Sequence, residues 1–161
     1  MMQSVAIQPS ISHDRFAAYG AIIDRPAQFG ERAFYSHWLG GENLAAVFHV
    51  NNVPMTTMPA VVDRLERHPH AAQCFVPLDV SRYLVTVAPS KADGSPDLEQ
   101  VETFLVPGTV GVLYAPGIWH AGISVIDRAG AFAVLMWRGA DDDDVFTDIS
   151  PLQLVTEEGQ A

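Results

Sequence analysis

The chain has 161 residues, a length that suits one domain. Its 9 Lys and Arg residues face 19 Asp and Glu residues, and the formal net charge of −10 argues against nucleic acid or an anionic membrane surface as a partner. Hydrophobic residues make up 48% of the chain and charged residues 17%, which indicates a globular protein with a well-filled core. We expect a single domain over 1–161, with ends at 1–12 and 150–161 that are flexible or take part in a dimer contact.

Membrane-spanning and secretory segments are not expected from the pattern of apolar residues. The longest apolar stretches, such as 130–137, fall far short of the roughly 20 residues that a spanning helix needs. Residues 1–13 show no basic region followed by an apolar run, so we expect a cytoplasmic protein. The single cysteine, Cys74, excludes an intrachain disulfide, and its neighbour Phe75 favours a buried structural thiol over a nucleophile.

Glycine and proline residues divide the chain into short apolar segments of strand length. A short helix is expected near the N-terminus, at 15–18 after Ser12. The predicted strands follow in chain order at 44–50, 60–67, 74–78, 83–88, 109–114, 122–126 and 131–137. Both faces of 83–88 are apolar, which predicts a strand that is buried on both sides.

A second helix is predicted over 96–105. Asp97 can cap it, apolar residues recur at helical spacing from Leu98 to Leu105, and Pro107-Gly108 would end it. Many short strands with one or two short helices predict a mainly β fold, either a sandwich or a barrel. The double-sheet jelly roll is the favoured architecture.

The densest polar cluster lies at 65–73. In an extended segment Glu66, His68 and His70 would point to one face, where imidazole and carboxylate groups could hold a divalent metal or a substrate. Pro69 argues against strict alternation, because proline belongs at a strand edge or a bend. The alternative is an exposed strand end with two solvated histidines.

A second polar cluster follows the turn at Pro116-Gly117. The residues after this turn should begin a new strand, with His120 near an entrance and Trp119 on the opposite face. Together with Glu66 and His68, His120 resembles the two-motif histidine arrangement of cupins, in which neighbouring strands bring separated ligands together inside a barrel.

Five motifs in this order resemble the ureidoglycolate lyase family, over roughly 16–148. They are Leu65-Glu66-Arg67-His68-Pro69, Gln73-x-Phe75-x-Pro77-Leu78, Tyr83-Leu84-Val85-x-Val87-Ala88-Pro89, Gly108-x-x-Gly111-Val112-x-Tyr114 and Gly117-Ile118-Trp119-His120. The resemblance implies a cupin-like β-barrel, or double-stranded β-helix, that forms a homodimer. It also implies cleavage of ureidoglycolate to glyoxylate and urea in allantoin breakdown, and a divalent metal, with nickel, manganese or zinc as candidates and no organic cofactor.

The resemblance also implies roles for individual residues. The catalytic residues would be His68, His120 and Glu66, and the metal ligands would come from Glu66, His68 and His120, to which the extended segment at 65–73 adds His70. Substrate-binding residues would be Gln73, Tyr114, Trp119 and Arg32. Arg138, at the end of an otherwise apolar strand, is a further candidate that could bind a substrate carboxylate. Arg138 could instead form a structural ion pair with one of the aspartates at 141–144, which themselves are typical of a solvated turn.

Three positions depart from the family pattern within the expected pocket: Ala72, Ala121 and His70. They keep two alternatives open. One is a cupin-fold enzyme that acts on another small hydroxy acid or carbonyl compound, and the other is a non-catalytic small-ligand binding protein.

Overall fold

Strands dominate the computed structural model, which describes residues 1–157. The strands are β1 (Gln3–Gln8), β2 (Gly20–Ile23), β3 (Ala45–Val53), β4 (Val61–Arg67), β5 (Gln73–Asp79), β6 (Arg82–Ala88), β7 (Glu102–Pro107), β8 (Gly111–Tyr114), β9 (Trp119–His120), β10 (Ser124–Ile126), β11 (Gly130–Arg138) and β12 (Val145–Val155). The helical segments are the α-helix α1 (His13–Phe16) and the 3-10 turns η1 (Ser36–Trp38) and η2 (Leu98–Gln100).

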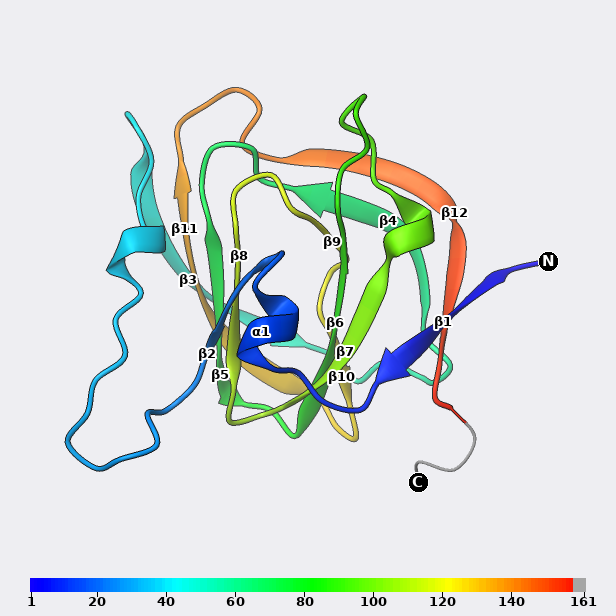
Figure 1. Cartoon of the computed structure of the whole chain (residues 1–161), viewed down its shortest axis with the longest axis horizontal. Helices are drawn as coiled ribbons and strands as arrows, with labels where there is room; N and C mark the ends of the chain where they lie inside the picture. Colours follow the sequence, from blue (N-terminus) through cyan, green and yellow to red (C-terminus); the bar gives the residue numbers. More distant parts are fainter. Residues whose placement is uncertain (158–161) are drawn as a thin grey trace.

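Two sheets build the fold. The larger one has seven strands in the order β10-β6-β7-β1-β12-β4-β9, and β9 also pairs with β6, so six of these strands close into a barrel. The smaller sheet has the order β2-β8-β5-β11-β3, and its strands run beside the barrel on the side away from the two chain termini (Figure 1). The mainly β, cupin-like barrel with few short helices is therefore confirmed.

Two apolar cores result from this arrangement. One fills the closed barrel and includes Leu65, Leu84 and Trp119. The other lies between the sheets and includes Tyr83 and Tyr114. Strand β6 contributes to both cores and is buried on both faces, as its apolar sequence predicts.

All seven predicted strands are present within a few residues of their expected bounds. The N-terminal helix is also present, two residues earlier than predicted, with the Ser12 side chain accepting a hydrogen bond from the backbone N–H of Arg15. The helix over 96–105 is wrong. Only the single turn η2 forms there, after which the chain extends into β7.

The N-terminal end contributes a strand to the barrel. Strand β1 pairs in parallel with both β12 and β7. At the other end, β12 continues to Val155. Residues 158–161 lie outside the described residues, and the expectation for them stays a prediction.

No helix in the described part of the chain is long and apolar enough to cross a membrane.

Candidate active site

The short strand β9 brings the two polar clusters of the sequence together. It pairs with β4 so that Glu66 and His120 lie directly opposite each other. Because side chains alternate along a strand, Arg67 and Trp119 then lie on the other face. The turn before β9 is fixed by Gly117, whose φ of 78° favours glycine and whose N–H donates to the carbonyl of His68 at 2.8 Å. Thus one turn sets the position of both histidines.

Glu66, His68 and His120 form a compact group. One ligand atom from each side chain lies within 4.8 Å of those of the other two. Glu66 Oε1 is 3.5 Å from His120 Nε2, and the two imidazole ring centroids are 5.2 Å apart. Both histidines are buried, at 6% and 1% exposure. The predicted convergence of these three residues is observed, and they could hold a metal ion.

The imidazole of His120 has a defined orientation. Its Nδ1 lies 3.0 Å from the carbonyl oxygen of Ile118, so Nδ1 carries the proton that this carbonyl accepts. Nε2 is buried and has no hydrogen-bond partner among residues 1–157. The ring also stacks on Tyr114, with centroids 4.1 Å apart and an interplanar angle of 11°. The lone pair of Nε2 therefore faces a carboxylate oxygen. A cation between these two atoms, either a proton or a metal ion, would bind to both.

His68 is held from both sides of its ring. Nδ1 lies 2.9 Å from Asp144 Oδ1 and 3.1 Å from the Asp143 carbonyl oxygen. Nε2 lies 2.9 Å from Gln73 Oε1. Arg138 donates two hydrogen bonds to Asp144, at 2.6 and 3.0 Å, so the carboxylate that orients His68 is itself fixed.

Two carboxyl groups of the site are held in the ionised form. Burial alone would raise the pKa of Glu66, but the imidazole of His120, whose Nε2 lies 3.5 Å from the carboxylate, and the nearby His68 outweigh it and lower that pKa. The pKa of Asp144 is also lowered, because Arg138 and His68 outweigh the effect of its burial. The site therefore combines two anionic groups with two imidazoles.

Tyr114 contributes a buried hydroxyl that has no hydrogen-bond partner among residues 1–157. Burial, together with the nearby Glu66 carboxylate, raises its pKa well above the ordinary value. The hydroxyl therefore keeps its proton and can donate a hydrogen bond to a bound molecule.

Three residues that the sequence assigned to the site lie elsewhere. Strand β4 ends at Arg67, and Pro69 and His70 form a turn, so strict alternation stops and His70 pairs instead with Asp142 at 2.6 Å. Trp119 belongs to the barrel core, where the Arg67 guanidinium lies 4.8 Å from its ring centroid. Arg32 lines a separate hollow formed by the loop after β2.

Asp144 is the residue that sequence reasoning missed. The acidic run at 141–144 was interpreted as a turn, and the chain does form a turn there between β11 and β12. The feature of the sequence that could have pointed to Asp144 is Arg138, for which an ion pair with a nearby aspartate was one of the two expectations. This ion pair is observed. What could not be read from the sequence is that the same carboxylate reaches His68.

Cys74, next to Gln73 on β5, points away from this group. It packs with Ala72 and Leu113 in a third small apolar cluster. Burial raises the pKa of its thiol to about 11. The prediction of a buried structural thiol is confirmed.

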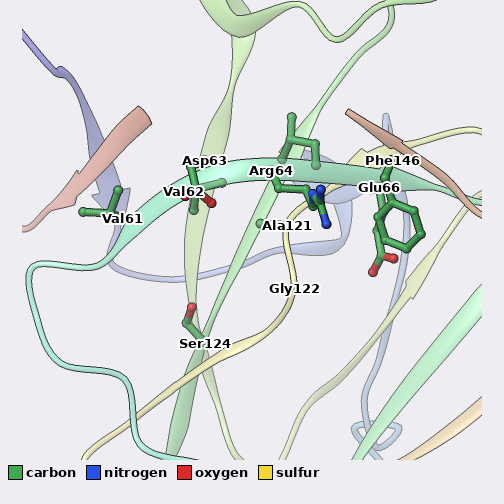
Figure 2. Close-up of a pocket in the computed structure, with 10 residues that line it drawn as sticks. Val61, Val62, Asp63, Arg64, Glu66, Ala121, Gly122, Ser124 and Phe146 are labelled. Atoms are coloured by element: carbon green, nitrogen blue, oxygen red, sulfur yellow. The ribbon is translucent and has the colours of Figure 1, made fainter. Parts of the chain in front are cut away.

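A cavity of about 320 Å³ opens beside the group and shares Glu66 with it. Figure 2 shows Glu66 and Arg64 of β4 on one side of this cavity and Ala121, Gly122 and Ser124 on the other. A small molecule in the cavity would therefore reach the Glu66 carboxylate directly.

The chain is similar to known ureidoglycolate lyases. The sequence profile of the family described as "Ureidoglycolate lyase" matches residues 39–154. A protein of Burkholderia mallei named "Ureidoglycolate lyase" is 31% identical over 153 residues, which cover 87% of this chain and 85% of the relative. Relatives of the same name are 28% identical in Escherichia coli, covering 84% of this chain and 89% of the relative, and 36% identical in Schizosaccharomyces pombe. The match to the S. pombe protein covers 56% of this chain and only 51% of that relative.

Proposed function

Because the chain belongs to the ureidoglycolate lyase family, we propose that it cleaves ureidoglycolate to glyoxylate and urea in the breakdown of allantoin. The observation that carries the proposal is the buried His120 Nε2, which faces Glu66 without a partner among residues 1–157. A buried polar atom without a partner is costly for stability. Such an atom is typical of a binding site, where a bound molecule or ion supplies the missing partner.

The substrate chemistry requires two proton transfers. In ureidoglycolate one carbon carries a hydroxyl, a carboxylate and the ureido nitrogen. Collapse to glyoxylate removes the hydroxyl proton, breaks the bond between carbon and nitrogen, and protonates the departing nitrogen. An acceptor and a donor must therefore lie on either side of that carbon.

We assign the acceptor to His120 and the donor to His68. Glu66 lines the cavity and lies 3.5 Å from His120 Nε2, and this nitrogen takes the hydroxyl proton. His68, oriented by Asp144, delivers a proton to the urea nitrogen, and the Gln73 amide next to it orients the ureido group by hydrogen bonding. The Tyr114 hydroxyl donates to a substrate oxygen.

We also propose a divalent metal, with nickel, manganese and zinc as candidates. Two imidazole nitrogens and one carboxylate oxygen suit these ions, and Glu66, His68 and His120 are the side chains that would hold one. This role is the alternative to the proton transfers assigned above, because a nitrogen that binds a metal ion has no lone pair left to accept a proton. When bound, such an ion would supply Lewis-acid chemistry that makes the substrate hydroxyl more acidic. His70 is not part of this set, since it pairs with Asp142.

The test is glyoxylate release from racemic ureidoglycolate by the purified protein, with each of the three metals and with a chelator. We expect release above the spontaneous background and a fall of roughly 100- to 10,000-fold in His68→Ala and His120→Ala. His70→Ala is the matched control and should retain activity. Full turnover in His120→Ala would refute the assignment, and no release with any metal would favour another small hydroxy acid as substrate.

We propose in addition that two copies of the chain pair through the outer face of the five-stranded sheet. Phe48 and Val50 on β3 and Val76 on β5 are 70%, 59% and 40% exposed, and the register aligns Val50 and Val76 on either side of Ala133. Strand β3 lies at the end of its sheet, and such an edge is a common site of pairing between chains. Light scattering should give twice the chain mass for the wild type and a monomer for Phe48→Asp. A monomeric wild type would contradict the proposal.

A further inference from the structure

The cavity next to Glu66 has an uneven charge. Its lining includes two acidic residues, Asp63 and Glu66, and a single basic residue, Arg64. The chain as a whole carries a formal net charge of −10. An anionic substrate that approaches Glu66 is therefore repelled unless a cation in the cavity compensates.

Arg64 lies on the same face of β4 as Glu66, two residues earlier. Two strand residues span roughly 6–7 Å, which is within reach of an extended arginine side chain. On the neighbouring strand β12, Asp148 lies opposite Arg64 and Phe146 lies opposite Glu66. Figure 2 shows the Arg64 guanidinium between Ala121 and Phe146, on the side of the strand where the Glu66 carboxylate also points.

The Arg64 guanidinium is oriented by its neighbours but is not saturated by them. Its Nε donates to Asp148 Oδ1 at 2.8 Å, and its central carbon lies 5.7 Å from the ring centroid of Phe146. Neither terminal amino group takes part in a hydrogen bond with residues 1–157. Two parallel N–H donors of this kind match the two oxygens of a carboxylate.

The other candidate arginines are less suited to this task. Both terminal nitrogens of Arg138 already donate to Asp144, which in turn orients His68. Arg32 lies in a loop that lines a different hollow. Arg67 faces the barrel core and stacks on Trp119. Among the arginines near the site, Arg64 is the one with free donors in the cavity.

We propose that Arg64 binds the carboxylate of the substrate and thereby sets the specificity of the site for 2-hydroxy acids. This inference rests on the proposed function and adds a residue that the family resemblance did not supply. With the carbon that carries the hydroxyl near Glu66 and His120, the carboxylate extends along β4 to Arg64 and the ureido group extends toward Gln73. The small residues Ala121 and Gly122 leave room for it on the opposite wall.

The test compares Arg64→Gln and Arg64→Lys with a matched control, Arg128→Gln. Arg128 forms an ion pair of the same kind with Asp79 at 2.8 Å, and its side chain is 50% exposed, compared with 60% for Arg64. We expect Arg64→Gln to raise KM for ureidoglycolate about tenfold or more, with kcat within about threefold of the wild type. Arg64→Lys should lie between the two, because lysine keeps the charge and loses the paired donors. Arg128→Gln should match the wild type.

An unchanged KM in Arg64→Gln would overturn the inference, and so would an equal rise in Arg128→Gln. Thermal unfolding of each variant identifies a general loss of structure, which we do not expect for side chains this exposed. A fall in kcat without a change in KM would also overturn the role of Arg64 in binding.

A binding experiment separates this inference from the proposed function. Glycolate and its uncharged amide, glycolamide, are titrated into the wild type and Arg64→Gln and followed by NMR. If the wild type releases no glyoxylate, the proposed lyase activity fails. The inference then stands if the Kd for glycolate rises about tenfold in Arg64→Gln while binding of glycolamide is unchanged, and it fails if both ligands behave alike or if glycolate does not bind.

Discussion

Two buried tyrosines at opposite ends of the core between the sheets show how differently the two ends are built. At one end Tyr83 of β6 donates its hydroxyl hydrogen to the carbonyl of Val110 at 2.6 Å. At the other end the hydroxyl of Tyr114 on β8 has no partner among residues 1–157. Both side chains are fully buried, and burial raises the pKa of both. At the first end the protein itself supplies the hydrogen-bond acceptor, whereas at the second end the acceptor would be the substrate that we propose.

The same contrast extends to the two Arg–Asp pairs. Arg82 and Asp127 form a pair with two hydrogen bonds near Tyr83, and Arg138 and Asp144 form one near Tyr114. Only Asp144 also contacts a histidine. The two ion pairs have similar geometry, so geometry alone does not distinguish a structural pair from one that supports the site. The distinction lies in the further contacts of the carboxylate.

The largest effect should come from the two aspartates. We expect Asp144→Asn to lower kcat roughly 10- to 100-fold with a smaller change in KM, because a second-layer partner that orients a histidine commonly has this effect. Asp127→Asn should leave both constants within twofold of the wild type. Steady-state kinetics on the two variants measures the difference. Equal losses in both would mean that Asp144 serves stability alone.

The two tyrosines should give the next largest effects. Loss of the Tyr83 hydroxyl should mainly lower stability, whereas loss of the Tyr114 hydroxyl should mainly lower activity. Tyr83→Phe leaves the buried Val110 carbonyl without a donor and should lower the free energy of unfolding by about 1–3 kcal/mol. Tyr114→Phe removes a hydroxyl that has no such partner and should lower it by less than about 0.5 kcal/mol, while glyoxylate release falls. Urea unfolding monitored by fluorescence checks the first part, and a stability loss in Tyr114→Phe as large as that in Tyr83→Phe would contradict the contrast.

The smallest effect concerns the pH dependence of stability at the Tyr83 end. The guanidinium of Arg82 and the hydroxyl of Ser81 hold the pKa of Asp127 well below its usual range. A carboxyl group with a lowered pKa in the folded state adds stability above its unfolded value of about 3.9, and this contribution is lost as the pH falls below that value. Because Asp127 is 38% exposed, the contribution is at most about 1 kcal/mol.

Urea unfolding at several pH values compares the wild type with Asp127→Asn. The difference between them should be constant from pH 7 to about 5 and shrink below about 4. A difference that grows as the pH falls would have the wrong sign and would exclude this explanation.

Most strands could be predicted because their apolar residues are bounded by glycine and proline. Strands β1, β2 and β12 were not predicted, and the segment 96–105, predicted as a helix, shows where this reasoning stops. Phe104 packs into the core between the sheets and Leu105 against the core of the barrel, so β7 is apolar on both faces. A strand that is buried on both sides lacks the alternation of apolar and polar residues that distinguishes a strand from a helix. The apolar residues from Leu98 to Leu105 therefore also fit a helical period.

The candidate site could be predicted in part. Glu66, His68 and His120 come together as their motifs indicated, because β4 and β9 are neighbours in the barrel. His70 was wrongly included because nothing local marks Arg67 as the last residue of β4. Trp119 was assigned to the pocket although the strand pattern had already placed it opposite His120.

The sequence by itself determined the segments that extend, the turns between them and the residue types available for catalysis, because these depend on neighbours within a few positions. Only the tertiary structure decided that β9 closes the barrel, that Asp144 reaches His68 and that the free donors of Arg64 share a cavity with Glu66. The first two contacts join parts of the chain that are distant in the sequence, and the cavity shared by Arg64 and Glu66 is completed by Ala121 and Gly122 from another part of the chain. Their distances depend on register and packing across the sheets, which no local pattern specifies.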